Sequence, residues 1–388
     1  MKMQDGELVS KKKIRDANIE LLRIAAMFMI VIYHIVCHCV NVQLTNPESV
    51  GQGAADVFNH PVFLGRLLIL NTVMTFGIIG NAVFILISGY FMANRDASDI
   101  KLGKISWVLV TEQLFAAMLL TIVPTIYHLY NPDLHIKLQT IMGFNGMSWF
   151  VGYYFVVVLC GALFLNKFLA GLDCKKYAAF LLTLFAFISF SWSGGLAEGL
   201  AGGLRTLLTG IFLYALGGFI RQFNPFRNIK VYTILLIIFF VYLLVWISGY
   251  NVTENNIQSY IQSASQNPFM QSVPGFDNFS IVTLVLAVCM FEIFRRINIP
   301  ANRVIAFLGK STFMVYLIHD SEFFYSLWNL RDWITTLSES MPMFIIQLLK
   351  WGAYTFFAGV LAYTAYMFVC RVIDRRLNPD IRRQMPVQ

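Results

Sequence analysis

Residues 19–42 read IELLRIAAMFMIVIYHIVCHCVNV, and this stretch decides the class of fold. It is longer than the roughly 20 residues that an α-helix needs to cross a bilayer. Glu20 and Arg23 are its only formally charged residues, and both lie close to one end. We therefore predict a membrane-spanning helix that turns most of its apolar surface to lipid or to neighbouring helices.

The composition indicates that further spans follow this one. Of the 388 residues, 57% are hydrophobic, 15% are aromatic and only 13% are charged, and the mean hydropathy is +0.65. Soluble domains carry about 25% charged residues, so this chain could not cover a water-exposed surface. The composition excludes a secreted disulfide scaffold, a disordered chain and an ordinary cytosolic enzyme. The six cysteines show no even spacing, and we expect reduced thiols.

Ten apolar runs approach or exceed the length of a span, so we predict an all-α fold, a polytopic transmembrane bundle of about ten helices. The runs cover residues 19–42, 68–93, 105–127, 147–166, 177–193, 201–220, 231–249, 279–294, 304–327 and 343–370.

The basic residues predict the orientation of the bundle. Most of the 29 lysines and arginines lie before residue 19, in 94–104, 167–176, 221–230 and 295–310, or after 370. With ten spans these segments share one side, and cytoplasmic loops collect Lys and Arg. We expect both termini in the cytoplasm, a plasma-membrane location and a first span that acts as a signal anchor. The formal charge of +8 therefore reports topology and not a nucleic-acid partner.

The predicted organisation has three parts. Residues 1–18 form a cytoplasmic N-terminal segment, 19–370 a transmembrane domain and 371–388 a cytoplasmic tail.

Two polar residues of the first span, Arg23 and His34, are candidates for function. They lie eleven residues apart, so they share one helix face about 16 Å apart along the axis. His38 lies one turn beyond His34. Ionisable groups inside a span are costly and usually functional. The alternative is that Arg23 extends to the headgroups while His34 packs among helices.

A metal site made of His34, Cys37, His38 and Cys39 is a further alternative for this helix. Histidines at i and i+4 can share a metal ion. However, Cys39 points to another face and no carboxylate lies nearby in the sequence. We therefore predict no metal site.

Other predicted spans carry polar groups at intermediate depth. His319 lies nine residues beyond Lys310, about 13 Å into the bilayer, and Glu112 lies about 12 Å beyond Lys104. Ser88 lies in the second span. A bundle normally turns such groups inward around a wet cavity, which fits a pump or channel as well as an enzyme. They can also hold helices together.

The acidic residues that follow His319 have two possible positions. Asp320 and Glu322 are candidates either to orient His319 or to lie at the outer rim of the membrane.

Five segments in chain order resemble motifs of the membrane-bound acyltransferase family 3. That family includes O-acetyltransferases of bacterial lipopolysaccharide, capsule, exopolysaccharide and peptidoglycan. Arg23 followed by His34 is similar to its Arg-x10-His signature. The other similar segments are Phe84-Ile-Leu-Ile-Ser-Gly-Tyr-Phe91, Trp149-Phe-Val-Gly-Tyr-Tyr154, Leu213-Tyr-Ala-Leu-Gly-Gly-Phe-Ile-Arg221 and Phe307-Leu-Gly-Lys-Ser-Thr-Phe-Met-Val-Tyr-Leu-Ile-His319.

This resemblance implies acyl transfer, most commonly of acetyl, from cytoplasmic acyl-CoA to a hydroxyl of a surface glycan or its lipid-linked precursor. Acyl-CoA would be a donor substrate, with no cofactor bound. His34 suits the role of general base, and Arg23 can bind a donor phosphate. His319, Ser88, Trp149 and Glu112 are candidates for binding substrate or donor, Trp149 as a surface on which a sugar stacks. A Gly-x-Ser-x-Gly motif would indicate an acyl-enzyme, and the sequence has none, so direct transfer is favoured.

Two other functions fit a polytopic chain. A transporter or exporter would carry inverted repeats and paired broken spans, and the sequence shows neither. The second such function is that of a membrane sensor module, of the kind that is fused to other enzymes. The sequence leaves open the acceptor, the acyl group, the side from which the acceptor enters and whether the chain forms a homo-oligomer.

Overall fold

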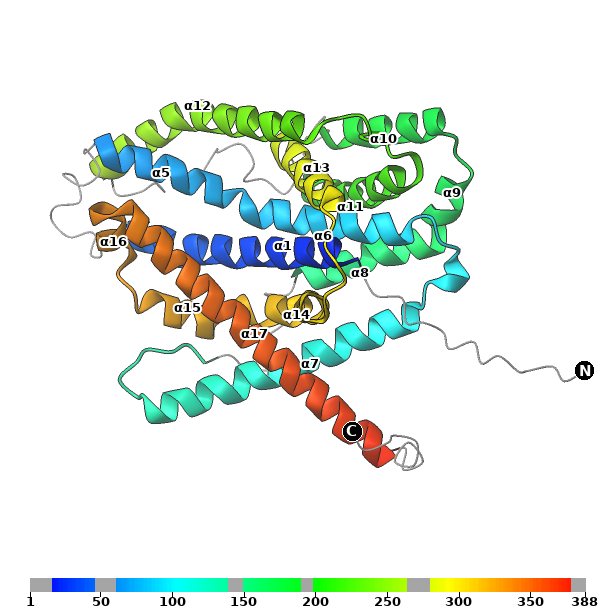
Figure 1. The fold of residues 1–388 in the computed structure, drawn as a ribbon. Helices are drawn as coiled ribbons and strands as arrows, with labels where there is room; N and C mark the ends of the chain where they lie inside the picture. The colour runs from blue at the N-terminus through cyan, green and yellow to red at the C-terminus, as the bar shows by residue number, and fades with distance from the viewer. Residues whose placement is uncertain (1–15, 46–60, 139–148, 190–197, 264–279, 378–388) are drawn as a thin grey trace, which may run out of the picture.

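The computed structural model describes residues 16–45, 61–138, 149–189, 198–263 and 280–377, and no β-strand occurs among them. The longer helices are α1 (Ala17–Ile35), α5 (Pro61–Met74), α6 (Phe76–Met92), α7 (Leu102–Tyr130), α8 (Trp149–Cys160), α10 (Cys174–Ser189), α11 (Glu198–Phe223), α12 (Val231–Ser263), α13 (Ile281–Arg296), α14 (Arg303–His319) and α17 (Met341–Leu377). The shorter ones are η1 (Val36–Val40), α2 (Asn41–Thr45), η2 (Ala97–Asp99), η4 (Gly161–Leu165), α9 (Asn166–Ala170), α15 (Glu322–Asn329) and α16 (Trp333–Glu339). The predicted all-α class is confirmed (Figure 1).

Seven helical stretches among the described residues are long and apolar enough to cross a membrane, which supports a multi-pass membrane protein. They are Ala17–Leu44, Val62–Met92, Ala97–Tyr130, Trp149–Ala170, Gly203–Phe223, Val231–Ser259 and Met341–Ile373. The three other predicted runs correspond to α10, α13 and α14, which have 16, 16 and 17 residues. These are shorter than the roughly 20 residues of a full span, so the count of ten stays a prediction.

The ninth predicted run, 304–327, does not form one helix. Helix α14 ends at His319, where Asp320 takes a non-helical conformation (φ −86°, ψ 67°) and Ser321 is extended (φ −143°, ψ 150°). The chain then begins the short helix α15. The Ser321 hydroxyl donates to the carbonyl of Ile318 at 2.8 Å and so pairs one of the carbonyls that the helix end leaves open. The apolar pattern continues through this break because Phe323, Phe324 and Trp328 of α15 are buried.

Helix α6 lies at the centre of the bundle and packs against α1, α11 and α13, while α1 also packs against α14 and α17 (Figure 1). The approach of α6 to α11 depends on Gly89. A Cβ atom at this position would collide with the main-chain carbonyl of Tyr214 on α11. Backbone cannot move aside as a flexible side chain can, so only glycine allows the two helices to come this close.

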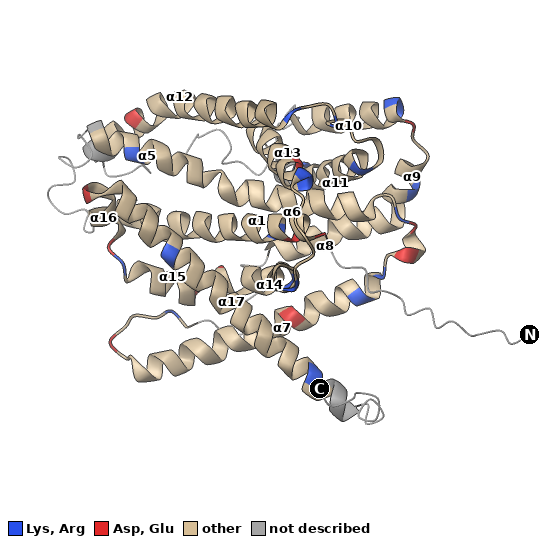
Figure 2. Ribbon diagram, in the orientation of Figure 1, with Lys and Arg blue, Asp and Glu red and all other residues tan. Residues whose placement is uncertain are grey.

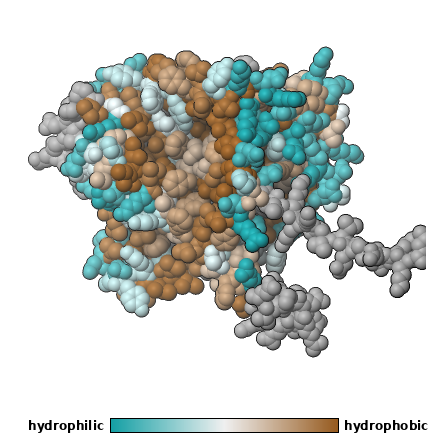
Figure 3. Space-filling view, in the orientation of Figure 1, coloured by the Kyte–Doolittle hydropathy of each residue, from teal (hydrophilic) through white to brown (hydrophobic). Residues whose placement is uncertain are grey.

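The surface is arranged as a membrane protein requires. Figure 3 shows an apolar band across the molecule with hydrophilic residues at both ends. Helix α12 contributes large exposed apolar side chains, among them Leu236, Phe239, Phe240 and Leu244. Figure 2 shows that most described Lys and Arg residues gather at the right-hand end of the bundle, where α1 begins.

The boundaries of the predicted terminal segments fall partly outside the described residues. Residues 1–15 and 378–388 are not among those that the structure describes. Helix α17 continues through Leu377, so the first residues of the predicted 371–388 tail are helical.

We expect Gly89→Val to destabilise the protein and Gly152→Val to have little effect. The added side chain at Gly89 meets backbone, and overpacking costs about 1–3 kcal/mol or more. Nothing lies within 4 Å of a Cβ atom at Gly152, which makes it the matched control in another helix. The thermal midpoint of each variant in detergent measures the difference. Equal midpoints for the two variants would contradict the role assigned to Gly89.

Candidate active site

Two histidines that are 285 residues apart in the sequence meet between α1 and α14. His34 Nδ1 lies 2.7 Å from His319 Nε2, and the two rings meet edge to edge, with centroids 4.8 Å apart and planes 13° from parallel. Each histidine is in the last turn of its helix, and the two helices pack side by side. The structure thus joins the ends of the first and last motifs recognised in the sequence.

The surroundings of His319 determine which nitrogen atoms carry protons. His319 Nδ1 lies 2.7 Å from the carbonyl oxygen of Tyr316 and 3.2 Å from that of Val315. A carbonyl only accepts, so Nδ1 carries the proton, and Nε2 of the neutral ring must be the acceptor. The proton in the contact between the rings therefore belongs to His34 Nδ1. The remaining lone pair is on His34 Nε2, which has no hydrogen-bond partner among the described residues.

The two histidines differ in exposure. His319 has no accessible surface, whereas 16% of the His34 side chain is accessible. Only His34 can therefore touch a small molecule, and His319 can act only through it.

Asp320, which the sequence offered only as a residue that orients His319 or lies at the rim, completes this cluster. Asp320 Oδ1 lies 3.9 Å from His34 Nδ1, and the hydroxyl of Tyr325 donates to the same carboxylate oxygen. The Tyr325 ring stacks on His38, with centroids 4.1 Å apart and planes 18° from parallel. The signal available in the sequence was an acidic residue directly after the motif histidine, but only the end of α14 at His319 turns it toward α1.

The structure shows that Asp320 and Glu322 have different partners. His319 is oriented by the carbonyl groups of Tyr316 and Val315 and by neither acid. Glu322 instead binds Lys137 at 3.3 Å, and the Lys137 side chain is exposed. Asp320 faces His34, and the rim position stays a prediction for Glu322.

The polar group that could hold a metal ion differs from the one weighed in the sequence. Ligand atoms of His34, His38 and Asp320 lie within 4.8 Å of one another. Cys39 is not part of the group, and its sulfur lies 3.8 Å from the Tyr325 carbonyl oxygen. Zinc bonds of about 2.1 Å in a tetrahedron would bring ligand atoms to about 3.5 Å of one another. The group as arranged is wider than that.

Arg23 lies on the same helix as His34, about 16 Å nearer the start of α1. Its guanidinium group forms an ion pair with Glu20 at 3.1 Å and is 25% exposed. Among the described residues only one of its N–H donors has a hydrogen-bond partner, so the others remain available to an anion. The buried Glu20 side chain lies over Gly309 of α14, where a Cβ atom would displace it.

Ser88, Glu112 and Trp149 do not contact the histidine pair. Ser88 donates to the carbonyl of Phe84 and pairs with the hydroxyl of Tyr154, both at 2.9 Å, which joins α6 to α8. Glu112 is buried in α7, and its Oε2 has no partner among the described residues.

Trp149 is 47% exposed at the start of α8 and connects to the histidines through other rings. Phe150 lies 5.8 Å from Trp149 and 5.7 Å from Tyr316, and Tyr316 lies 5.5 Å from His319, measured between ring centroids. Trp149 also borders a cavity of about 20 Å³ between α6, α8 and α11, next to Asn81. This is space for about one water molecule.

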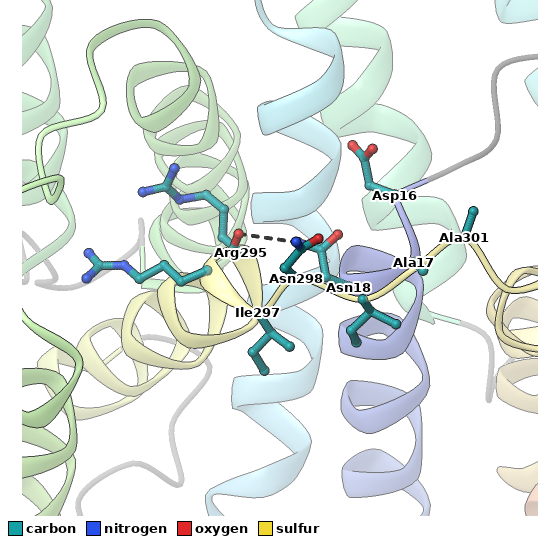
Figure 4. A pocket seen from close by; sticks show the side chains of 9 residues that line it. Asp16, Ala17, Asn18, Arg295, Ile297, Asn298 and Ala301 are labelled. Carbon is teal, nitrogen blue, oxygen red and sulfur yellow. Dashed lines mark hydrogen bonds between the residues drawn. The ribbon is translucent and has the colours of Figure 1, made fainter.

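A larger hollow of about 340 Å³ lies beside the first turn of α1 (Figure 4). Asn18 donates across it to the carbonyls of Phe294 and Arg295, at 3.1 and 3.3 Å. The Arg295 side chain points away from Asn18 (Figure 4) and binds Glu292 at 2.9 Å, as Arg296 does at 3.0 Å. A ligand in this hollow would therefore meet mainly amide and main-chain groups, because both arginine side chains are paired with Glu292.

One comparison with known proteins found a match. The family described as an acyltransferase domain, acyltransferase family 3, matches residues 16–373. This range contains the histidine pair, Asp320 and Arg23. Searches of curated proteins and of solved structures found no match.

We expect ¹⁵N NMR of histidine-labelled protein to show His34 as the tautomer protonated at Nδ1. The two acceptors that face this nitrogen, His319 Nε2 and Asp320 Oδ1, require it. His319→Ala removes the nearer acceptor and should let the other tautomer of His34 become populated. His135 lies outside this cluster, and its signal serves as the internal control. A His34 protonated at Nε2 in the wild type would contradict the assignment.

Proposed function

This chain belongs to acyltransferase family 3, and we propose that it moves an acyl group, acetyl first among them, from cytoplasmic acyl-CoA to a hydroxyl of a cell-surface glycan or its lipid-linked precursor. The observation that carries the proposal is the hydrogen bond between His34 and His319, which leaves one partly exposed lone pair on His34. Acyl-CoA enters as a substrate, with no bound cofactor.

The proposed topology has ten spans in the plasma membrane, with both termini in the cytoplasm. It adds α10, α13 and α14 to the seven longer stretches. The basic end of the bundle, where α1 begins, then faces the cytoplasm. In this orientation Arg23 lies near the cytoplasmic surface, and the histidine pair lies about 16 Å deeper, toward the outer side. We assign residues 1–18 and 371–388 to the cytoplasm and 19–370 to the transmembrane domain.

In the proposed reaction His34 is the general base. The acceptor hydroxyl gives its proton to His34 Nε2 while its oxygen bonds to the thioester carbonyl carbon. The carbon–sulfur bond then breaks, and the leaving CoA sulfur takes the proton from Nε2. His34 is neutral before and after the transfer, and no acyl-enzyme forms. His319 is buried and cannot touch the acceptor. It supports this step through its hydrogen bond to His34 Nδ1.

Arg23 is the proposed contact for the phosphates of the donor. Its uncommitted N–H donors and partial exposure support bidentate binding of a phosphate. Trp149 is the proposed stacking surface for an acceptor sugar that enters from the outer side, since half of its surface is exposed and rings connect it to His319. Ser88 and Glu112 are assigned to the packing and the polar lining of the bundle.

Acetyl-CoA should raise the thermal midpoint of the wild type in detergent and fail to do so in Arg23→Ala. A ligand that binds only the folded state stabilises it by about 2.7 kcal/mol at a hundredfold excess over Kd. Arg227→Ala removes the same charge from an exposed position between α11 and α12 and serves as the control. No shift in the wild type with acetyl-CoA or other short acyl-CoAs would favour the transporter and sensor alternatives.

His34→Gln should lower transfer of [¹⁴C]acetyl from acetyl-CoA to envelope glycans of the source cells by about 10²–10⁴-fold, the usual contribution of a general base. The thermal shift with acetyl-CoA should persist, because the donor phosphates bind elsewhere. Full transfer activity in a properly inserted His34→Gln protein would show that His34 is not the base.

A further inference from the structure

We propose that Asp320, held in place by Tyr325, is the anionic partner that stabilises the positive charge formed on His34 during transfer. This inference rests on the proposed function and adds two positioning residues to it. Neither residue is needed to explain the family match or the histidine pair. Asp320 directly follows α14, and Tyr325 lies in α15.

Asp320 lies close to the positive charge that forms on His34. When His34 Nε2 takes the acceptor's proton, the ring becomes a cation with a proton on each nitrogen. The groups around it are Tyr33 of α1 and His38 of η1, at ring distances of 5.0 and 5.4 Å, and His319 and Asp320 at the end of α14. Of these neighbours only Asp320 can supply a negative charge, and its oxygen lies 3.9 Å from Nδ1.

The charge of Asp320 is not already neutralised by a base. Among the described residues no lysine or arginine forms an ion pair with Asp320. Its side chain is only 13% exposed. A largely desolvated carboxylate without a cationic partner does not stabilise a fold, which favours a role in the chemistry.

Tyr325 fixes the carboxylate in the position that this role requires. Its hydroxyl donates to Oδ1, the same oxygen that faces His34, and its ring is held against His38. The break after His319 makes the arrangement possible. In a continuous helix Asp320 would lie about 100° around the axis from His319, so the two adjacent residues could not both face the same nitrogen of α1.

The division of work resembles the logic of a catalytic triad, in which an acid behind the imidazole holds its tautomer and stabilises the imidazolium. Here two groups share the task. His319 accepts the Nδ1 proton at 2.7 Å, and Asp320 supplies the charge at 3.9 Å. The proton itself moves only between the acceptor oxygen, His34 Nε2 and the CoA sulfur, so Asp320 stays ionised throughout.

The test compares kcat and KM for [¹⁴C]acetyl transfer from acetyl-CoA to envelope glycans of the source cells. Asp320→Asn keeps the shape and removes the charge, and kcat should fall about 100-fold. The KM for acetyl-CoA should not change, because the charge acts only after substrate is bound. Asp320→Glu should restore part of kcat. Glu322→Gln, which removes an equal charge two residues away, is the matched control and should retain wild-type kcat.

Tyr325→Phe provides a second, milder variant. It keeps the ring on His38 and removes only the hydroxyl, and kcat should fall about 10-fold. If Tyr325 acts through Asp320, the double variant with Asp320→Asn should be no slower than Asp320→Asn alone. Additive losses would mean that Tyr325 acts independently and would overturn its assigned role.

The outcomes separate this inference from the proposed function. Asp320→Asn with kcat within twofold of wild type, or with a raised KM and unchanged kcat, overturns the inference while leaving the acyltransferase intact. If Asp320→Asn fails to fold, wild-type kcat in Tyr325→Phe overturns it equally. A wild type that transfers no acetyl group overturns the proposed function and this inference with it.

Discussion

The hydrogen bond between His34 and His319 is the interaction on which the rest of the site depends. It joins the end of α1 to the end of α14, and the carbonyls behind His319 fix the proton positions in both rings. Where no water can compete, hydrogen-bonding groups pair inside the protein, and three of the four ring nitrogen atoms do so here. The free lone pair on His34, the only partly exposed one of the pair, follows from this arrangement.

The irregular parts of the helices are as important here as the regular ones. Directly after His34 the first span continues as the π-helical segment η1, against which α15 packs. Single-turn π segments inside α-helices occur often at functional sites. On the facing side α14 stops at His319, and the chain turns at Asp320 and Ser321. Two uninterrupted helices could have brought the histidines together but not the carboxylate and Tyr325 as well.

The two residues to which the proposed function gives donor binding and base catalysis are far apart on one helix. Arg23 and His34 share α1 but lie about 16 Å apart, one beside Glu20 near the helix start and the other in the cluster with Asp320. A donor whose phosphates bind at one end would have to extend along α1 to bring its thioester to the other. The proposed function, with a cytoplasmic donor and an acceptor from the opposite side, requires such a separation.

The helical class, the multi-pass character and the family follow from the sequence alone, because apolar length, low charge and ordered motifs are local properties. The sequence also selected His34 and His319, since ionisable groups inside spans are costly. It did not determine that these two histidines touch, that α14 ends within the predicted 304–327 run, or that Asp320 rather than Glu322 faces His34. An apolar pattern does not reveal where a helix breaks when the segments before and after the break are both buried, as α14 and α15 are here. Contacts between residues 285 positions apart are decided by how the helices pack, and only the tertiary structure contains that information.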